Sequence, residues 1–428
     1  MHIFNLALST GHYPSRWKIS RVQPIPKTSD TANIENYRPI AILSSLAKLF
    51  ESTLHSRIGS QIQPYLCDSQ HGFRFNRSVN TNLVTLVDLI SQHLDNGIQV
   101  DVVYFDFKKA FDRVDNDVLL SKLSGIGFTQ KLLRLFASYL RDRQQFVRHG
   151  CFVSSPYHTR SGVSQGSILG PLLFGVMVND LELLLKHSRC LLYADDLKLV
   201  YGIEEEADTL TLQEDIDSVL QWSINNKLLF NSAKCCVMSF SRANNPRHAH
   251  YFLGTEPIAR VDSVMDLGVL FDSRLTFHNH MRALATSSFR RLGFVIRNMR
   301  EFDNPLAIRL IYMALVRSKL ESSSIIWNPH ESTYILLLEK VQKAFLRFFY
   351  KKQFGYYPFL YPTKFLLGML QFNSLQVRRN YSLITFACQA LRGKSDCPDI
   401  VSQIVRLFIP LVPKMQLRPR KHQERLNY

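Results

Sequence analysis

The sequence predicts an α+β body that extends to about residue 275 and an all-helical lobe beyond it. Short apolar runs such as Val102–Phe105 are typical of buried strands. Between these runs, apolar residues recur at the three-to-four spacing of amphipathic helices. After about residue 276 only the helical spacing remains. We therefore expect two parts, residues 1–275 and residues 276–428.

The chain carries a strongly positive charge. Its 52 Lys and Arg residues against 35 Asp and Glu give a formal net charge of +17. Such a field favours a polyanionic partner, either nucleic acid or an anionic membrane surface. The longest apolar run, Ile168–Val178, includes Gly and Pro and is too short to span a bilayer. None of the seven cysteines has disulfide-framework or zinc-site spacing, so we expect reduced thiols inside a cell.

The elements of the body follow from periodicity and from turn residues. Prolines among basic and aromatic residues in 1–45 favour extended segments and turns. The expected helices are 44–62, 82–94, 115–123, 130–140, 167–186 and 204–226. The expected strands are 102–105, a hairpin at 144–160, the two sides of a turn within 190–201, then 235–240 and 266–271. In the helical lobe, Asn304 and Pro305 are expected to open a helix as its N-cap and first residue.

Two adjacent aspartates, Asp195 and Asp196, separate two apolar runs and predict a tight β-hairpin with both carboxylates at its tip. Carboxylates held close together repel each other unless a cation lies between them. Mg²⁺ prefers carboxylate, phosphate and water oxygens. An ordinary polar turn is the alternative interpretation of such a pair.

Two more aspartates add to this pattern. Asp106 ends the strand at 102–105, and Asp112 follows six residues later. Asp106 and the two hairpin aspartates make three carboxylates, and three carboxylates that converge on two metal ions suit an in-line displacement at phosphorus. The spacing therefore suggests phosphoryl or nucleotidyl transfer.

A rival enzyme class comes from Gly162–Gly166, which matches the Gly-x-Ser-x-Gly elbow of α/β-hydrolases. Ser164 would be the nucleophile, with Asp195 and either His278 or His280 as its partners. The chain lacks the alternating strands and helices of a parallel sheet, which argues against this class. The aromatic and basic segment Phe345–Tyr361 has two interpretations as well: aromatic packing in the lobe, and phosphate contact by its Lys and Arg residues.

Taken together, these segments resemble the reverse transcriptase of LINE-type non-LTR retrotransposons, in particular jockey-like elements. The motifs that carry the resemblance occur in order as Pro24–Lys27, Asn36–Ile40, Gln70–Arg74, Phe105–Asp112, Gln165–Pro171, Tyr193–Asp196, Asn231–Lys234 preceded by Trp222, and Leu267–Val269 as a primer-grip strand. Trp327–Pro329 and the pair Arg378 and Arg379 are similar to the helical region after such polymerases.

The resemblance implies a right-hand polymerase with fingers, a palm built on an antiparallel sheet, and a helical thumb. Residues 1–275 would form fingers and palm, and residues 276–428 the thumb and C-terminal region. Asp106, Asp195 and Asp196 would be the catalytic and metal-binding residues, with two Mg²⁺ ions for which Mn²⁺ could substitute.

The resemblance also implies a nucleotide site. Lys27 and Arg38 would hold the incoming triphosphate, and Phe111 would exclude the ribose 2′-hydroxyl, which leaves Asp112 a structural role. The remaining members are Gln165 and Gly166, which would shape the nucleotide and template pocket, and Lys234, which would donate a proton to pyrophosphate or form a plain salt bridge.

The expected function is RNA-directed DNA synthesis, in which dNTPs are added to a primer 3′-hydroxyl. The expected partners are an RNA template, a DNA primer or target DNA, and dNTPs, with no membrane and with protein partners unknown. The expected location is intracellular, in the nucleus, with a cytoplasmic RNA–protein particle stage. Neither an endonuclease nor a Cys/His knuckle is found, so a fragment of a larger reading frame is expected. The alternative is a catalytically silent remnant that still binds nucleic acid.

Overall fold

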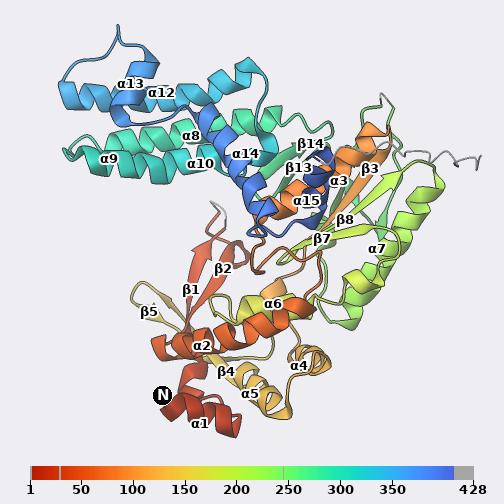
Figure 1. Cartoon of the computed structure of the whole chain (residues 1–428). Coiled ribbons are helices and arrows are strands. Elements are labelled where there is room, and N and C mark those ends of the chain that lie inside the picture. The colour runs from red at the N-terminus through yellow and green to blue at the C-terminus, as the bar shows by residue number, and fades with distance from the viewer. Residues whose placement is uncertain (1, 28–29, 244, 409–428) are drawn as a thin grey trace, which may run out of the picture.

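The computed structural model describes residues 2–27, 30–243 and 245–408. An N-terminal sheet with its helices lies at one end and a helical lobe at the other, and a central sheet lies between them (Figure 1). Short 3₁₀ helices connect the elements at Ser15–Lys18, Ile34–Asn36, Gln63–Tyr65, Ala110–Arg113, Glu182–Leu184 and Ser232–Lys234. Within those residues, no helix has the length and apolar character needed to cross a membrane.

The N-terminal sheet is built around β1 (Ile19–Pro26), which pairs antiparallel with β2 (Tyr37–Ile42) and parallel with β4 (Arg143–His149). Strands β5 (Phe152–Val153) and β6 (Tyr157–Thr159) both pair with β4, so the predicted hairpin at 144–160 is confirmed. Helices α1 (His2–Thr10), α2 (Ser45–Ile62) and α5 (Gln130–Leu140) accompany this sheet.

Helix α2 begins where the sequence predicted, because the Ser44 side chain accepts a hydrogen bond from the backbone N–H of Ala47. Phe50 is buried in an aromatic cluster with Trp17, whose ring centroid is 5.6 Å away. The apolar spacing of this helix also includes Leu46 and Leu49, but both are more than half exposed, so its buried face is narrower than its apolar sequence.

The central sheet has the strand order β12-β9-β3-β8-β7. The strands are β3 (Gln99–Phe105), β7 (Arg189–Tyr193), β8 (Asp196–Ile203), β9 (Cys236–Phe240) and β12 (Ala259–Arg260). All pairs are antiparallel except β12 with β9, so the predicted antiparallel sheet is confirmed for its four main strands. Strand β3 lies in the middle and is buried along most of its length, as its apolar sequence predicted.

The central sheet separates two hydrophobic cores because side chains of a strand alternate between its faces. Val103 and Phe105 belong to the core shared with the N-terminal sheet. Val100 and Val102 belong to the core shared with the helical lobe. Helix α3 (Val79–Asp95) packs on the second of these faces, and α4 (Asn116–Gly125), α6 (Gly170–Met177) and α7 (Ala207–Asn225) contribute to the first core.

The predicted helix at 167–186 is wrong over most of its length, because α6 spans only Gly170–Met177. Pro171 lies in the first turn, where a missing N–H costs nothing. Beyond the helix, the Asn179 and Asp180 side chains bond to other segments of the chain instead of facing solvent on a continuing helix. The apolar composition of 167–186 reflects burial rather than a long helix.

The predicted strand at 266–271 is a hairpin of β13 (Ser263–Asp266) and β14 (Val269–Asp272). Its turn residues Leu267 and Gly268 have φ values of 45° and 87°. Two consecutive positive φ values are typical of a two-residue hairpin turn. Strands β10 (Phe252–Leu253) and β11 (Glu256–Pro257) form another small hairpin.

Helices build the described part of the chain after residue 276, as predicted. They are α8 (His278–Asn298), α9 (Pro305–Tyr312), a π-helical segment Met313–Arg317, α10 (Ser318–Glu321), α11 (Ser324–Trp327), α12 (Ser332–Phe354), α13 (Thr363–Leu370), α14 (Leu375–Leu391) and α15 (Pro398–Phe408). Asn304 caps α9 by accepting from two backbone N–H groups, which confirms the predicted start. Tyr312 and Phe345 stack with their ring centroids 3.7 Å apart, so the aromatic-packing interpretation is confirmed for Phe345.

The lobe also joins residues that lie far apart in sequence. Arg379 is buried, and its Nε donates to Asn328 Oδ1 at 3.0 Å, which links the two motifs of the predicted C-terminal region. Helix α15 returns from the lobe to pack on α3 (Figure 1). There Gln403 Nε2 donates to Asp88 Oδ2 at 2.8 Å.

Candidate active site

The predicted hairpin at Asp195 and Asp196 is present. Strands β7 and β8 pair as far as Tyr193 and Asp196, so Ala194 and Asp195 form a two-residue turn. Ala194 has a φ of 56°, which is unusual for a residue other than glycine. Asp195 therefore lies in the turn, and Asp196 is the first residue of β8.

The strand order brings Asp106 next to this hairpin. Strand β3 pairs with β8 up to Phe105 and Leu197, so Asp106 follows directly beside the start of β8. A pocket of about 230 Å³ opens at this point. Asp106, Asp196 and Lys234 line it together with residues of the β13–β14 hairpin.

The three carboxylates influence one another. Burial, and then the charge of Asp106, raises the pKa of Asp195, whereas the charges of Arg38 and Lys27 lower it. Burial by surrounding atoms, followed by the charge of Asp195, raises the pKa of Asp196 to about 6. The Asp196 side chain is also exposed at the surface, where solvent screens its charge.

The donor chemistry fits a divalent metal ion. Oxygen ligands whose negative charges repel are stabilised by a hard cation. In residues 2–27, 30–243 and 245–408, however, no three His, Cys, Asp or Glu side chains are arranged as ligands of one ion. The three aspartates therefore lie close together without converging on a single point.

Lys234 lines the same pocket. Its Nζ is 3.6 Å from Asp106 Oδ2, and both side chains are partly exposed. This ion pair agrees with the salt-bridge interpretation of Lys234. It also leaves the ammonium group at the pocket.

Lys27 and Arg38 come from the paired ends of β1 and β2. Arg38 pairs with Ile25, and the Lys27 N–H donates to the Asn36 carbonyl at 2.7 Å. Both side chains are exposed, and their positive charges lower the pKa of Asp195. Two cations from the region of the N-terminal sheet thus act electrostatically on a carboxylate of the hairpin.

Phe111 belongs to the segment that follows Asp106, and its ring packs against helix α6. Its ring stacks on buried Phe174 with centroids 4.7 Å apart and an interplanar angle of 13°. The ring of Phe73 meets it edge-on at 6.4 Å. Phe111 keeps part of its surface exposed.

The Gly162–Gly166 segment connects this region to β2. Gln165 Nε2 donates to Asp112 Oδ1 at 3.0 Å, which is in keeping with the structural role expected of Asp112. The Gln165 carbonyl accepts from the Ala41 N–H at 2.6 Å. Gly166 has a φ of 110°, and a Cβ there would lie 2.6 Å from the Ala41 carbonyl oxygen, so the position requires glycine.

The structure contradicts the hydrolase alternative. His278 Nε2 lies 2.6 Å from Glu331 Oε1, and the ring of His278 stacks on Tyr334. His280 Nδ1 accepts from the Leu270 N–H at 3.1 Å. Both histidines are thus engaged within the lobe and its border, so they are not positioned as the base for Ser164.

Several buried polar groups beside the site were not predicted. Glu51 on α2 accepts from the N–H groups of Ile168 and Leu169, and burial raises the pKa of its carboxyl. Gln70 contacts the turn at Ala194. The sequence signal for Glu51 was an acidic residue on the predicted helix at 44–62, and for Gln70 its place in the motif Gln70–Arg74; neither signal identifies the partner.

Comparisons with known proteins agree with this geometry. The family model described as reverse transcriptase (RNA-dependent DNA polymerase) matches residues 25–296. The probable RNA-directed DNA polymerase from transposon BS of Drosophila melanogaster is 32% identical over 303 residues, which cover 68% of this chain and 33% of that protein. The RNA-directed DNA polymerase from mobile element jockey of the same species is 29% identical over 290 residues, 65% of this chain and 31% of that protein.

Among solved structures, telomerase from Candida tropicalis in complex with a fragment of telomeric RNA aligns with a TM-score of 0.43 and 13% identity, over 93% of this chain and 65% of that one. The chain spans about a third of the length of the two curated relatives. The family match covers the central sheet, the N-terminal sheet apart from most of β1, the three aspartates and most of α8. The chain therefore belongs to the reverse transcriptase family, and within it to the non-LTR retrotransposon type.

Proposed function

We propose that the chain is an RNA-directed DNA polymerase that adds dNTPs to the 3′-hydroxyl of a DNA primer on an RNA template. One arrangement carries the proposal. Asp106 and Asp196 line one pocket, Asp195 lies in the adjoining turn, and two cations of the N-terminal sheet act on Asp195. Acidic groups that would hold metal ions and basic groups that would hold a triphosphate thus interact electrostatically.

The carboxylates of Asp106, Asp195 and Asp196 would hold two Mg²⁺ ions, with Mn²⁺ as a possible substitute. When bound, such ions make the primer hydroxyl more acidic and stabilise the charge that develops on the leaving pyrophosphate. The chemical support for this assignment is that burial, and then the mutual repulsion of the aspartates, raises the pKa of Asp195 and Asp196.

The remaining residues would bind and orient the nucleotide. Lys27 and Arg38 would contact the triphosphate, and the Arg38 guanidinium suits a bidentate contact. Gln165 and Gly166 would shape the pocket for base and template, because the Gln165 carbonyl bonds to β2 and the Gln165 side chain bonds to Asp112. Lys234, released from Asp106, would donate a proton to pyrophosphate.

A primer-extension assay on an RNA template, with Mg²⁺ titrated from zero, tests the proposal. We expect metal-dependent extension by the natural chain. Asp195→Asn should reduce extension by at least about 100-fold, the scale on which loss of one electrostatic group acts in an active site. The matched control is Asp217→Asn, since Asp217 is exposed on α7.

Two outcomes would overturn the proposal. Retention of activity by Asp195→Asn to within threefold would contradict the assignment of the metal site. Binding of primer–template by the natural chain without any extension would instead support the catalytically silent remnant.

We further propose that residues 1–275 act as fingers and palm and residues 276–428 as thumb and C-terminal region. The support is that β14 ends at Asp272 and α8 begins at His278. A nuclear location with a cytoplasmic RNA–protein particle stage would follow from a DNA primer and an RNA template. Cell fractionation of the tagged chain, with and without RNase, tests this location.

A further inference from the structure

A short segment runs beside the strand that leads into the catalytic turn. The Leu192 N–H donates to the Ser69 carbonyl at 2.9 Å, and the His71 N–H donates to the Leu192 carbonyl at 2.8 Å. Gln70 thus forms an isolated parallel bridge with Leu192 on β7. Leu192, the bridge partner of Gln70, lies two residues before Ala194, so the bridge places Gln70 next to the Ala194–Asp195 turn.

The side chain of Gln70 bonds directly to this turn. It is 1% exposed, and its Oε1 accepts from the Ala194 N–H at 3.2 Å and from the Gly72 N–H at 2.7 Å. A buried backbone N–H needs an acceptor, and Gln70 provides one for a turn residue whose φ is positive. Its Nε2 is buried and has no hydrogen-bond partner among the described residues.

Gly72 completes the contact from the backbone side. A Cβ at Gly72 would lie 2.3 Å from the Ala194 nitrogen and 3.1 Å from the Ala194 Cα. The φ of Gly72 is not positive, so close approach rather than backbone conformation requires glycine here. The turn therefore rests on the peptide of Gly72 and is hydrogen-bonded to the amide of Gln70.

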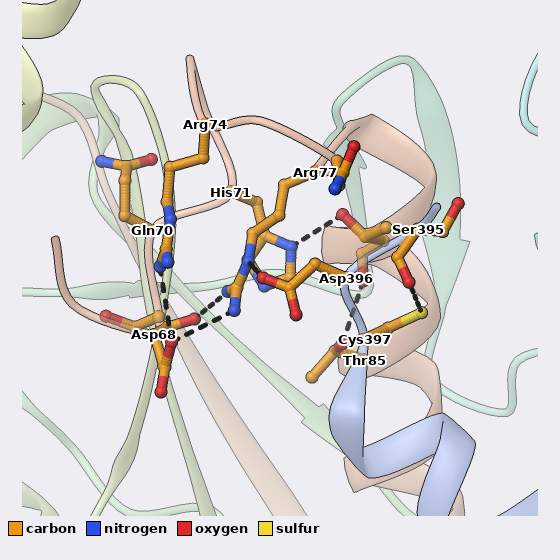
Figure 2. Close-up of polar contacts among 12 residues, drawn as sticks. Asp68, Gln70, His71, Arg74, Arg77, Thr85, Ser395, Asp396 and Cys397 are labelled. Carbon is orange, nitrogen blue, oxygen red and sulfur yellow. Dashed lines mark hydrogen bonds and ion pairs between the residues drawn. The ribbon is translucent and has the colours of Figure 1, made fainter. Parts of the chain in front are cut away.

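The loop that carries these two residues is itself anchored (Figure 2). The Arg77 side chain is 3% exposed and pairs with Asp396 at 2.6 Å and with Asp68 at 3.2 Å. His71 Nδ1 lies 2.8 Å from Thr81 Oγ1, and burial lowers the pKa of His71 to about 3, so its ring is neutral. Gln70 thus acts from a fixed position rather than from a mobile loop.

We propose that Gln70, together with Gly72, is a positioning residue that fixes the Ala194–Asp195 turn and thereby the direction of the Asp195 carboxylate. This inference rests on the proposed function, because it assigns the turn a metal-binding task. Gln70 is not a catalytic residue, since it bonds to the turn rather than to the reacting groups. Loosening the turn should weaken divalent metal binding and slow nucleotide addition, but leave primer–template binding unchanged.

A substitution that removes both the acceptor Oε1 and the unpaired Nε2 of Gln70 can distinguish this positioning role from a purely structural one. Gln70→Met keeps the length of the side chain and removes the buried unpaired donor along with the acceptor. A structural role predicts a change in stability alone, because the Ala194 and Gly72 N–H groups lose their acceptor and removal of the unpaired Nε2 offsets only part of that loss. A positioning role predicts weaker metal binding in a chain that is still folded.

The experiment uses the full chain and four variants. Gln70→Met, Gln70→Asn, Gln70→Glu and the control Gln61→Met, at an exposed position of α2, are compared by Mn²⁺ binding in a calorimeter without nucleotide. Primer extension, primer–template binding and thermal unfolding are measured on the same samples. We expect Gln70→Met and Gln70→Asn to bind Mn²⁺ about tenfold more weakly and to extend primers at least about tenfold more slowly, as is typical when a group that orients a metal ligand is lost.

Gln70→Glu keeps an acceptor oxygen at the same reach and should recover Mn²⁺ binding to within about threefold of the natural chain, because the hydrogen bond to Ala194 is retained. Natural Mn²⁺ binding and rate in folded Gln70→Met would overturn the inference and leave the proposed function intact. Should Gln70→Met fail to fold, Gln70→Asn decides in the same way. Absence of extension by the natural chain would instead count against the proposed function.

Discussion

Lys198 Nζ lies 2.6 Å from Asp266 Oδ2, and the two side chains are only 1% and 3% exposed. Lys198 follows Asp196 by two residues on β8, whereas Asp266 ends β13. The same ammonium donates to Asn82 Oδ1 on α3 at 2.7 Å. One buried cation thus holds three elements together below the active-site hairpin.

We predict that Lys198→Met lowers the free energy of unfolding by about 3–5 kcal/mol, because removing one partner of a buried pair leaves the other charge uncompensated. Urea denaturation followed by circular dichroism measures this change. The control Arg141→Met breaks the exposed pair between Arg141 and Asp117 and should cost at most about 1 kcal/mol. Equal effects of the two substitutions would contradict the prediction.

The sequence predicted the elements whose apolar pattern and turn residues are local. The hairpin at Asp195 and Asp196, the strand before Asp106 and the N-cap at Asn304 are of this kind, and each depends on residues within a few positions. The motif order then indicated which strands meet, although spacing alone left the Ser164 alternative open.

The remaining features depend on partners that are distant in sequence. The helix at 167–186 is short because Asn179 and Asp180 bond to segments more than 40 residues away. The β13–β14 turn begins at Leu267, a residue that gives no turn signal by itself. Gln70 and Lys198 are polar residues whose partners at Ala194 and Asp266 only the folded chain brings together.

The raised pKa of Asp196 predicts a pH dependence of metal binding. Burial and the charge of Asp195 shift this pKa from 3.8 to about 6, so a proton competes with the metal ion below pH 6. We expect the Mg²⁺ concentration for half-maximal extension to rise by up to about tenfold per pH unit below pH 6. Primer extension at pH 5, 6 and 7 with titrated Mg²⁺ measures this, and a flat profile would contradict it.

The raised pKa of Asp196 also makes the folding stability of the metal-free chain depend on pH. Because the folded chain binds the Asp196 proton more tightly than the unfolded chain, this stabilising contribution is present at low pH and is lost as pH rises from about 4 to 6. Asp196→Asn should therefore stabilise the metal-free chain at pH 7, by about 1 kcal/mol once solvent screening of this exposed group is included. Thermal unfolding in EDTA with the variant and the natural chain tests the sign.

The contacts of Arg77 predict that the start of α15 and the loop 68–77, which contacts the Ala194–Asp195 turn, stabilise each other. Its guanidinium pairs with Asp396 just before α15, and the Asp396 N–H donates to the Asn76 carbonyl at 2.8 Å. Arg77→Met should cost about 1–3 kcal/mol locally, because a charge-assisted hydrogen bond is lost. We expect faster amide hydrogen exchange in 393–405 and in 68–77, with the central sheet unchanged. A change confined to one of the two segments would contradict the link.

The net charge of +17 predicts steep salt dependence of nucleic-acid binding. Each phosphate contact releases condensed counterions, so affinity falls as salt rises. We expect the affinity for a primer–template duplex to fall at least about 100-fold between 50 and 200 mM salt. Fluorescence anisotropy at several salt concentrations measures this slope. Affinity that is independent of salt would exclude a phosphate-lined groove.

A substitution at Phe111 tests whether its ring excludes the ribose 2′-hydroxyl and whether that ring lies in the nucleotide site. The ring is held by stacking on Phe174 at 4.7 Å, and one part of it stays exposed near the residues that follow Asp106. A bulky ring beneath the sugar would leave no room for a 2′-hydroxyl, and such steric exclusion disappears when the side chain is shortened. We predict that Phe111→Val raises ribonucleotide relative to deoxyribonucleotide incorporation more than about tenfold, which is about 1.4 kcal/mol of differential transition-state binding.

Packing alone gives a different result for the same substitution. If the Phe111 ring only supports Phe174, truncation costs roughly 3 kcal/mol or less of stability and lowers both incorporation rates together. Phe128→Val is the matched control, because Phe128 is also half-buried and contacts another ring, Phe136, at 5.6 Å. Both rates are measured on soluble protein of each variant under single-turnover conditions. A ratio that changes in Phe111→Val and not in Phe128→Val identifies the sugar gate, and an unchanged ratio in both would assign Phe111 to packing.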